Sequence, residues 1–265
     1  MENVVVRNNV TVTGNPDKKV MLFAHGFGCD QTAWNYIKGA FADDYKLVLF
    51  DYVGAGNSDC GQYDFNKYAS LEGYVTDVLE ICNTLALEEV IFVGHSVSCM
   101  IGALAAIQQP GLFSKLVFVA PSPCYITGDA YTGGFDLETI NALFEVMEED
   151  YITWANLLAP AVMNKSNGTL LTQQMADSFC SIDPVIAKQF ARVTFLSDNR
   201  SDLPFIPVQS LTIQCTEDTI APVAVGQYMN ANTPDNQLVM LEALGHCPHI
   251  SHPAATVAAI KTYLL

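Results

Sequence analysis

The chain has 265 residues, half of them hydrophobic, which is enough for one large domain or one domain with an insertion. Its formal net charge is −16, with only 12 lysines and arginines, and this argues against nucleic acid and anionic membrane surfaces as partners. The sequence contains no run of about 18 apolar residues, so no membrane span is predicted.

The first predicted element is a β-hairpin. Two short apolar runs, residues 4–6 and 10–12, flank Asn8 and Asn9, a pair suited to a tight turn. The same start lacks the basic and apolar regions of a secretory signal, so we expect a cytoplasmic protein. The eight cysteines form no Cys-x-x-Cys pair, which in such a protein favours free, buried thiols.

Apolar strands then alternate with helical patterns along most of the chain. Near-continuous apolar strands are typical of a parallel sheet that is covered on both faces. Strand–helix alternation therefore predicts an α/β doubly wound fold. The predicted strands are residues 19–26, 46–51, 89–94, 115–121, 210–215 and 237–242, and the clearest helices are 71–85, 97–109 and 253–265.

The alternation stops over residues 122–201, where four amphipathic helical patterns follow one another without a strand. We interpret this segment as a helical lid inserted into the core formed by residues 1–121 and 202–265. Its polar side is acidic, which is typical of a solvated face.

A candidate catalytic motif, FVGHSVSCMIG, begins at Phe92. A strand that enters a helix through Gly-x-Ser is typical of the sharp turn that exposes a nucleophilic serine, here Ser96. The usual motif ends in a second glycine, and Ser98 occupies that position. A serine hydroxyl is a poor nucleophile near neutral pH, so a base must lie close to it.

Late in the chain, the segment LEALGHCPHISHP offers three histidines, of which His246 comes first after a predicted strand, ahead of His249 and His252. An acid that orients this histidine is expected after the preceding strand. Asp218 fits best there, with Glu217 as the competitor. Asp198 and Asp202 lie further from any strand end. The order Ser96, Asp218, His246, each after a strand, predicts a catalytic triad.

An oxyanion hole requires two N–H donors, and we expect them from Val97, directly after the serine, and from Phe27 in FAHGFG. His25 and His95 are interpreted as structural side chains. Asp51, in the glycine-containing segment DYVGAGNSD, is interpreted as part of a turn beside that loop. No nucleotide-binding or zinc motif is present, so no cofactor or metal is expected.

Several segments together resemble the α/β-hydrolase superfamily, and within it the RsbQ branch of bacterial stress-response regulators and, more distantly, the plant karrikin and strigolactone receptors. These segments are FDYVGAGNSD, LEGYVTDVLEICNTLALEEVIFVGHSVSCMIG, APSPCYI, CSIDPVIAKQFARVTFLSDNR and GHCPHISHP. Plant members also carry Gly-His-Ser-Val-Ser, so Ser98 fits this branch.

The resemblance implies an α/β-hydrolase fold, with a mostly parallel sheet flanked by helices and a four-helix lid over an apolar pocket. It also implies slow hydrolysis of a small hydrophobic ester or lactone in signalling, and a PAS-domain phosphatase as partner. A ligand receptor with incidental turnover and an ordinary detoxifying esterase are the alternatives. A haloalkane dehalogenase is disfavoured because it would have aspartate in place of Ser96.

The lid aromatics predict the pocket itself. A thin layer of amphipathic helices must turn one side toward the serine, and such pockets commonly enclose about 300–1,000 Å³. We expect its lining to include Phe27, Phe135, Trp154 and Phe195, with Val97 at its base.

Overall fold

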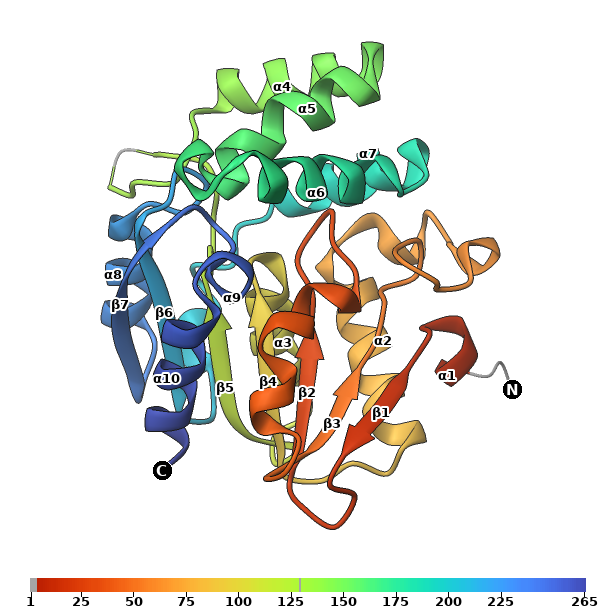
Figure 1. Cartoon of the computed structure of the whole chain (residues 1–265), viewed down its shortest axis with the longest axis vertical. Coiled ribbons are helices and arrows are strands. Elements are labelled where there is room, and N and C mark those ends of the chain that lie inside the picture. Colours follow the sequence, from red (N-terminus) through yellow and green to blue (C-terminus); the bar gives the residue numbers. More distant parts are fainter. Residues whose placement is uncertain (1–3, 129) are drawn as a thin grey trace.

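The computed structural model describes residues 4–128 and 130–265. Within these ranges, one seven-stranded sheet has the order β1-β3-β2-β4-β5-β6-β7, and only β1 is antiparallel to its neighbour (Figure 1). The mostly parallel sheet confirms the predicted α/β class. The strands are β1 Thr11–Gly14, β2 Val20–Ala24, β3 Lys46–Leu49, β4 Val90–His95, β5 Phe113–Val119, β6 Ser210–Glu217 and β7 Asn236–Leu244.

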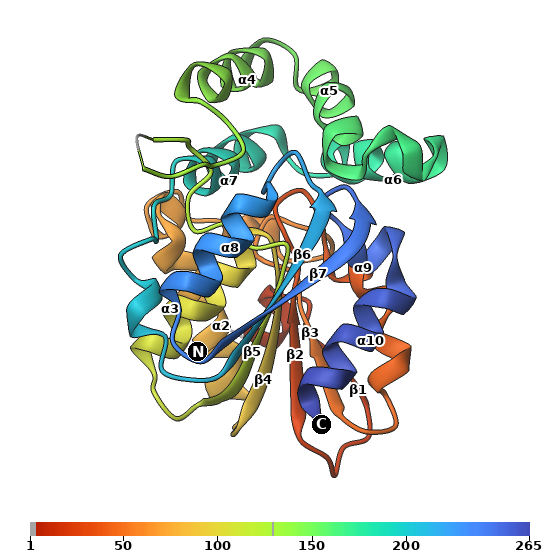
Figure 2. The same cartoon turned by 90° about the vertical axis from the view of Figure 1, so that its left-hand side faces the viewer.

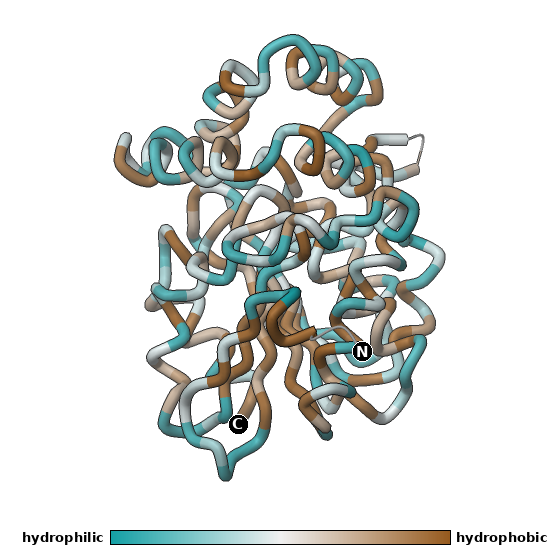
Figure 3. The backbone as a smooth tube through the Cα atoms, turned by 90° about the vertical axis from the view of Figure 1, so that its right-hand side faces the viewer, coloured by the Kyte–Doolittle hydropathy of each residue, from teal (hydrophilic) through white to brown (hydrophobic). Residues whose placement is uncertain are grey.

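Helices cover both faces of this sheet. Figure 2 shows α2, α3 and α8 on one face and α9 and α10 on the other. Buried Phe92 packs on the first face and buried Phe23 on the second. Because both faces are covered, the strands are mostly apolar, and they form the brown centre of Figure 3. The helix bounds are α2 Leu71–Thr84, α3 Val97–Gln108, α8 Val223–Asn232, α9 Pro248–Ser251 and α10 Pro253–Leu264.

Four further helices lie between β5 and β6 in the chain and above the carboxyl edge of the sheet (Figures 1 and 2). Three of them begin at an aspartate, Asp136, Asp150 or Asp183, whose carboxylate accepts a backbone N–H of the first turn. They form the predicted four-helix lid and share one apolar cluster. Their bounds are α4 Leu137–Glu149, α5 Tyr151–Met163, α6 Thr169–Cys180 and α7 Pro184–Phe195.

Short 3₁₀ helices fill several connections, and the first of them packs against β2 and α9. In the described ranges no helix combines the length and the apolar character that crossing a bilayer requires. All eight cysteines are free; six are buried as expected, whereas Cys60 is exposed and Cys180 is partly exposed. The 3₁₀ helices are η1 Gln31–Tyr36, η2 Lys38–Phe41, η3 Cys60–Gln62, η4 Lys67–Ala69, η5 Lys165–Asn167 and η6 Leu203–Phe205.

The hairpin predicted at the start of the chain is wrong. The first apolar run lies in a short helix, α1 Val4–Arg7, and the second belongs to β1, which pairs with β3 through Thr11 and Leu49. The partner of β1 is thus a distant strand rather than its neighbour in sequence.

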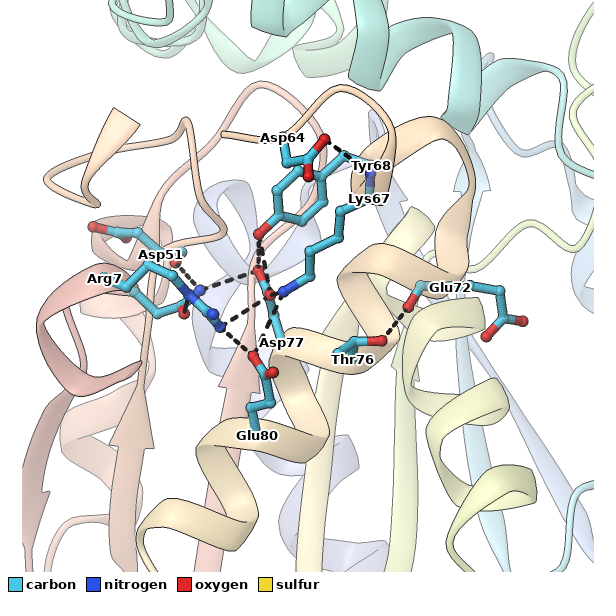
Figure 4. A network of polar contacts seen from close by, with 10 residues as sticks. Arg7, Asp51, Asp64, Lys67, Tyr68, Glu72, Thr76, Asp77 and Glu80 are labelled. Carbon is cyan, nitrogen blue, oxygen red and sulfur yellow. Dashed lines mark hydrogen bonds and ion pairs between the residues drawn. The ribbon is translucent and has the colours of Figure 1, made fainter. Parts of the chain in front are cut away.

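A buried ion network holds α1 in place (Figure 4). The Asp77 carboxylate, on α2, is fully buried and accepts hydrogen bonds from Arg7 at 3.1 Å, Lys67 at 2.7 Å and Tyr68 at 2.8 Å. Arg7 also pairs with Glu80 at 2.6 Å. A buried charge is costly unless it is paired, so this set of partners fixes the helix to α2.

Candidate active site

The turn between β4 and α3 carries Ser96 in a strained backbone conformation. Its φ is 55° and its ψ −124°, a region that residues with a side chain rarely occupy. Gly94 makes the turn possible, because a Cβ there would lie 2.8 Å from the backbone of Ser98. The strain and the glycine match the expected nucleophile turn.

Ser98, which replaces the second glycine of the usual motif, has a buried and fully used side chain. Its hydroxyl donates to the backbone oxygen of His25 and lies 2.9 Å from the hydroxyl of Tyr52. Ser98 therefore ties the start of α3 to the loop after β2 and to the segment after β3. The departure from glycine adds a contact between the elements that surround Ser96.

The three residues expected to act together form one hydrogen-bonded chain. His246 Nε2 lies 2.8 Å from Ser96 Oγ, and His246 Nδ1 lies 2.7 Å from Asp218 Oδ2. All three side chains are buried. The other carboxylate oxygen of Asp218 accepts the N–H groups of Ile220 and Ala221, at 2.9 and 3.0 Å, which fixes its orientation. With Nδ1–H donated to Asp218, Nε2 remains as the acceptor for the serine proton.

The competing histidines lie elsewhere. His249 is buried between Trp34 and His95, with each ring centroid 4.5 Å away, and burial lowers its pKa to about 3. His252 bonds through Nδ1 to the Ser251 hydroxyl at 2.8 Å. Neither has a recorded hydrogen bond to Ser96 among the described residues.

The competing acids also have other surroundings. Glu217 is exposed at the end of β6. Asp198 pairs with Arg200 at 2.6 Å, and Asp202 accepts from Asn199. The Asp51 carboxylate accepts three N–H groups at 2.7–3.0 Å, and so holds its turn, as interpreted from the sequence.

Two buried histidines support the loops around the serine. His25 Nε2 accepts the N–H of Tyr52 at 3.1 Å, and burial lowers the pKa of His25. His95 Nε2 lies 2.9 Å from the backbone oxygen of His246, so it links the serine turn to the histidine loop. The β2 loop packs directly on His95, because a Cβ on Gly26 would lie 2.4 Å from His95 Nδ1.

The expected oxyanion donors flank this arrangement. Phe27 follows Gly26 in the loop after β2, and Val97 is the first residue of α3. Within the described ranges, neither backbone N–H is recorded in a hydrogen bond. Both N–H groups are thus available to a ligand oxygen, as donors of an oxyanion hole must be.

A model of the alpha/beta hydrolase family matches residues 21–260. The chain belongs to the α/β hydrolase family. It is 37% identical to a protein of Oryza sativa subsp. japonica that is named a probable esterase, over 97% of this chain and 95% of that protein. It is 35% identical to a strigolactone esterase of Arabidopsis thaliana, over 99% and 98%. A solved hydrolase from Oleispira antarctica superposes with a TM-score of 0.96 at 40% identity, over 99% and 96%. The α/β-hydrolase fold is thereby confirmed.

Sequence reasoning missed one polar neighbour of the serine in this α/β hydrolase. The Tyr125 hydroxyl lies 3.1 Å from Ser96 Oγ, and the side chain is almost fully buried. The single hydroxyl hydrogen of Ser96 forms the hydrogen bond to His246. The Tyr125 hydroxyl is therefore the donor in its hydrogen bond to Ser96 Oγ. Burial raises the pKa of Tyr125, which keeps the hydroxyl protonated. Only its position soon after a strand end, in APSPCYI, hinted at such a place.

Tyr125→Phe is expected to lower kcat for ester hydrolysis about tenfold. Oγ carries more negative charge when its proton leaves, and again when it is expelled from the acyl-enzyme, so a donor to Oγ binds the transition states more tightly. Phenylalanine keeps the volume, and the melting temperature should change little. Steady-state kinetics with p-nitrophenyl acetate tests this, and a faster variant would show that Tyr125 instead blocks the serine.

A small cavity, here called the serine cavity, lies over Ser96. Its volume is about 30 Å³, which is roughly the space of one water molecule. The expected pocket volume was about 300–1,000 Å³. Aromatic side chains fill the remaining space, because four rings pack around Phe27 at 5.6–6.0 Å. The lining residues are Phe27, Cys29, His95, Ser96, Tyr125, Leu158, Val162, Met175, Phe179, Thr194, Phe195, Ile220, His246 and Cys247.

The structure places the residues of the predicted lining at different distances from the serine. Phe27 and Phe195 line the serine cavity, whereas Phe135, Trp154 and Val97 do not. Phe135 packs behind Phe195, at 5.9 Å between ring centroids. Trp154 stacks on Tyr151 at 5.4 Å and packs behind Phe27, at 6.0 Å between ring centroids. Helical spacing predicted that Trp154 is buried, but neighbours in space decide which side chains reach the serine.

Proposed function

We propose that this protein is a serine hydrolase that acts on small, neutral, hydrophobic esters or lactones. The hydrogen-bonded chain from Asp218 through His246 to Ser96 is the observation that carries the proposal. Relatives named as esterases support hydrolysis as its chemistry.

In the proposed reaction, the Ser96 proton passes to His246 Nε2 while Oγ bonds to the substrate carbonyl carbon. The carbonyl oxygen becomes an oxyanion and accepts the N–H groups of Phe27 and Val97. The bond to the leaving oxygen then breaks, and this oxygen takes the proton from His246. A water molecule then gives a proton to His246 while its oxygen bonds to the acyl carbon. The bond from that carbon to Oγ breaks, Oγ takes the proton back from His246, and the acid is released. Asp218 holds the imidazole tautomer and stabilises its positive form.

The walls of the serine cavity point to a neutral substrate. Most of them are apolar side chains, and the buried Asp218 would repel an anion. Removing the hydration of a charge at such a place costs several kcal/mol. We therefore expect kcat/KM for p-nitrophenyl butyrate to exceed that for the similar-sized anionic p-nitrophenyl succinate about a hundredfold. Equal turnover of the anion would contradict this substrate class.

A second candidate function is ligand perception with slow turnover. Two observations favour it: curated relatives include proteins named karrikin insensitive 2 receptors, and the serine cavity is too small for a whole ester without rearrangement. On this proposal the protein is a cytoplasmic regulator of the RsbQ type that acts on a PAS-domain phosphatase. Mass spectrometry of small molecules retained from cell extract by Ser96→Ala protein separates the two candidates: one tightly held ligand favours perception, and a mixture of weakly held esters favours a general esterase.

A further inference from the structure

A second hollow lies beside the serine cavity and reaches the surface between the segment around η1 and the lid. This outer groove has a volume of about 300 Å³, ten times that of the serine cavity. Tyr36 and Gln174 belong to its exposed part, and their side chains meet through a 3.3 Å hydrogen bond. The groove is lined by Cys29, Asp30, Thr32, Ala33, Asn35, Tyr36, Met163, Leu171, Gln174, Met175, Ser178 and Ile250.

Two side chains, Cys29 and Met175, line both hollows and so form the partition between them. Each is only 4% exposed. Burial raises the pKa of the Cys29 thiol to about 12, so this part of the partition is a neutral, apolar wall. Methionine is unbranched and flexible, and Met175 can change rotamer without a change in the backbone of α6.

The backbone around the partition is held tightly. A Cβ on Gly28, whose φ is 77°, would lie 2.0 Å from the Phe179 ring, so α6 packs directly on the β2 loop. Ser178 Oγ donates to the Gly28 oxygen at 2.7 Å, and the Tyr151 hydroxyl donates to the Phe179 oxygen at 2.7 Å. Moving α6 would break these contacts, whereas moving the end of one methionine breaks none of them.

We propose that the outer groove is the second half of the substrate site, and that it holds the acyl chain of an extended neutral ester. When Met175 turns aside, the two hollows join. The leaving alcohol takes its proton from His246 and departs past the His246 side chain. The groove borders the loop of Phe27 through Cys29. Because that loop is proposed to hold the carbonyl oxygen, we assign the acyl chain to the groove.

The groove walls fit this occupant. Ala33, Met163 and Leu171 offer apolar contact to a hydrocarbon chain. The Asp30 carboxylate disfavours an anionic chain end, while neutral Asn35 and Gln174 tolerate a polar one. The inference rests on the proposed function, since it extends the site of the same serine.

Two neighbouring glutamines on α6 give a matched test. Gln174 lines the groove and Gln173 does not, and both are exposed, so replacing either by tryptophan should leave folding intact. We expect Gln174→Trp to lower kcat/KM for p-nitrophenyl octanoate about tenfold relative to p-nitrophenyl acetate, because the indole occupies the space of the chain. Gln173→Trp should leave the ratio within about twofold of the wild type. Identical ratios in the two variants would overturn the proposal.

A second pair tests the partition. Met175→Ala should raise the octanoate-to-acetate ratio of kcat/KM about fivefold, because it removes the side chain between the hollows. Met147→Ala, a buried change on α4 that touches neither hollow, controls for loosening of the lid. Equal ratios in these two variants would also count against the proposal. If the wild type hydrolyses neither ester in a Ser96-dependent way, the proposed function fails and this inference falls with it. Ser96-dependent hydrolysis with unaltered ratios rejects the groove alone.

Discussion

Ser96→Ala is expected to lower kcat for p-nitrophenyl acetate about 10⁴- to 10⁶-fold and to leave the fold intact. The loss is large because Oγ is the atom proposed to bond with the substrate, and in the described part of the chain no other hydroxyl is recorded in a hydrogen bond with His246 Nε2. Folding should survive, since the Ser96 backbone N–H still donates to Val119 at 3.0 Å.

A matched hydroxyl deletion at the far end of the sheet provides the control. Ser114 lies at the start of β5, and its hydroxyl donates to the backbone oxygen of Glu89. Ser114→Ala should keep full turnover. Circular dichroism and thermal melting establish that both variants fold. Near-native turnover by Ser96→Ala would place the nucleophile on another residue and would remove the basis of the proposed reaction.

The sheet and the triad could be predicted because both depend on local patterns. A strand buried on both faces is apolar along most of its length, so 20–24 and 90–93 are visible as continuous apolar runs. Parallel strands end at the same edge, and a residue that follows a strand therefore lies near that edge. Ser96, Asp218 and His246 come together for this reason, although 150 residues separate the first from the last.

What the sequence did not predict depends on contacts between distant segments. Tyr125 reaches the serine because its irregular segment is held by a bridge between Ile126 and Phe135, with no periodic pattern to mark it. The N-terminal error has the same origin, since β1 pairs with β3 and Arg7 with Asp77. The small serine cavity likewise results from side-chain packing across the lid, which spacing along a helix does not specify.

His246→Ala is expected to reduce turnover as severely as Ser96→Ala, because the two residues act as one unit and the loss of either one disables it. Without the imidazole, Ser96 keeps its proton and the leaving oxygen has no proton donor. The substitution also leaves a space next to Ser96 and Asp218. Added imidazole should therefore restore part of the activity of His246→Ala and none of that of Ser96→Ala, as measured by initial rates over increasing imidazole concentration.

The other two histidines of the same loop make this prediction selective. His252 is only partly buried and contacts Ser251, so His252→Ala should retain turnover within about twofold, the range expected for a surface change. His249→Ala removes a buried ring from between Trp34 and His95, and it should lower the melting temperature more than kcat. A loss of several orders of magnitude in kcat for folded His249→Ala, with turnover preserved in His246→Ala, would move the base to His249. The 2.8 Å contact between His246 Nε2 and Ser96 Oγ predicts the opposite result.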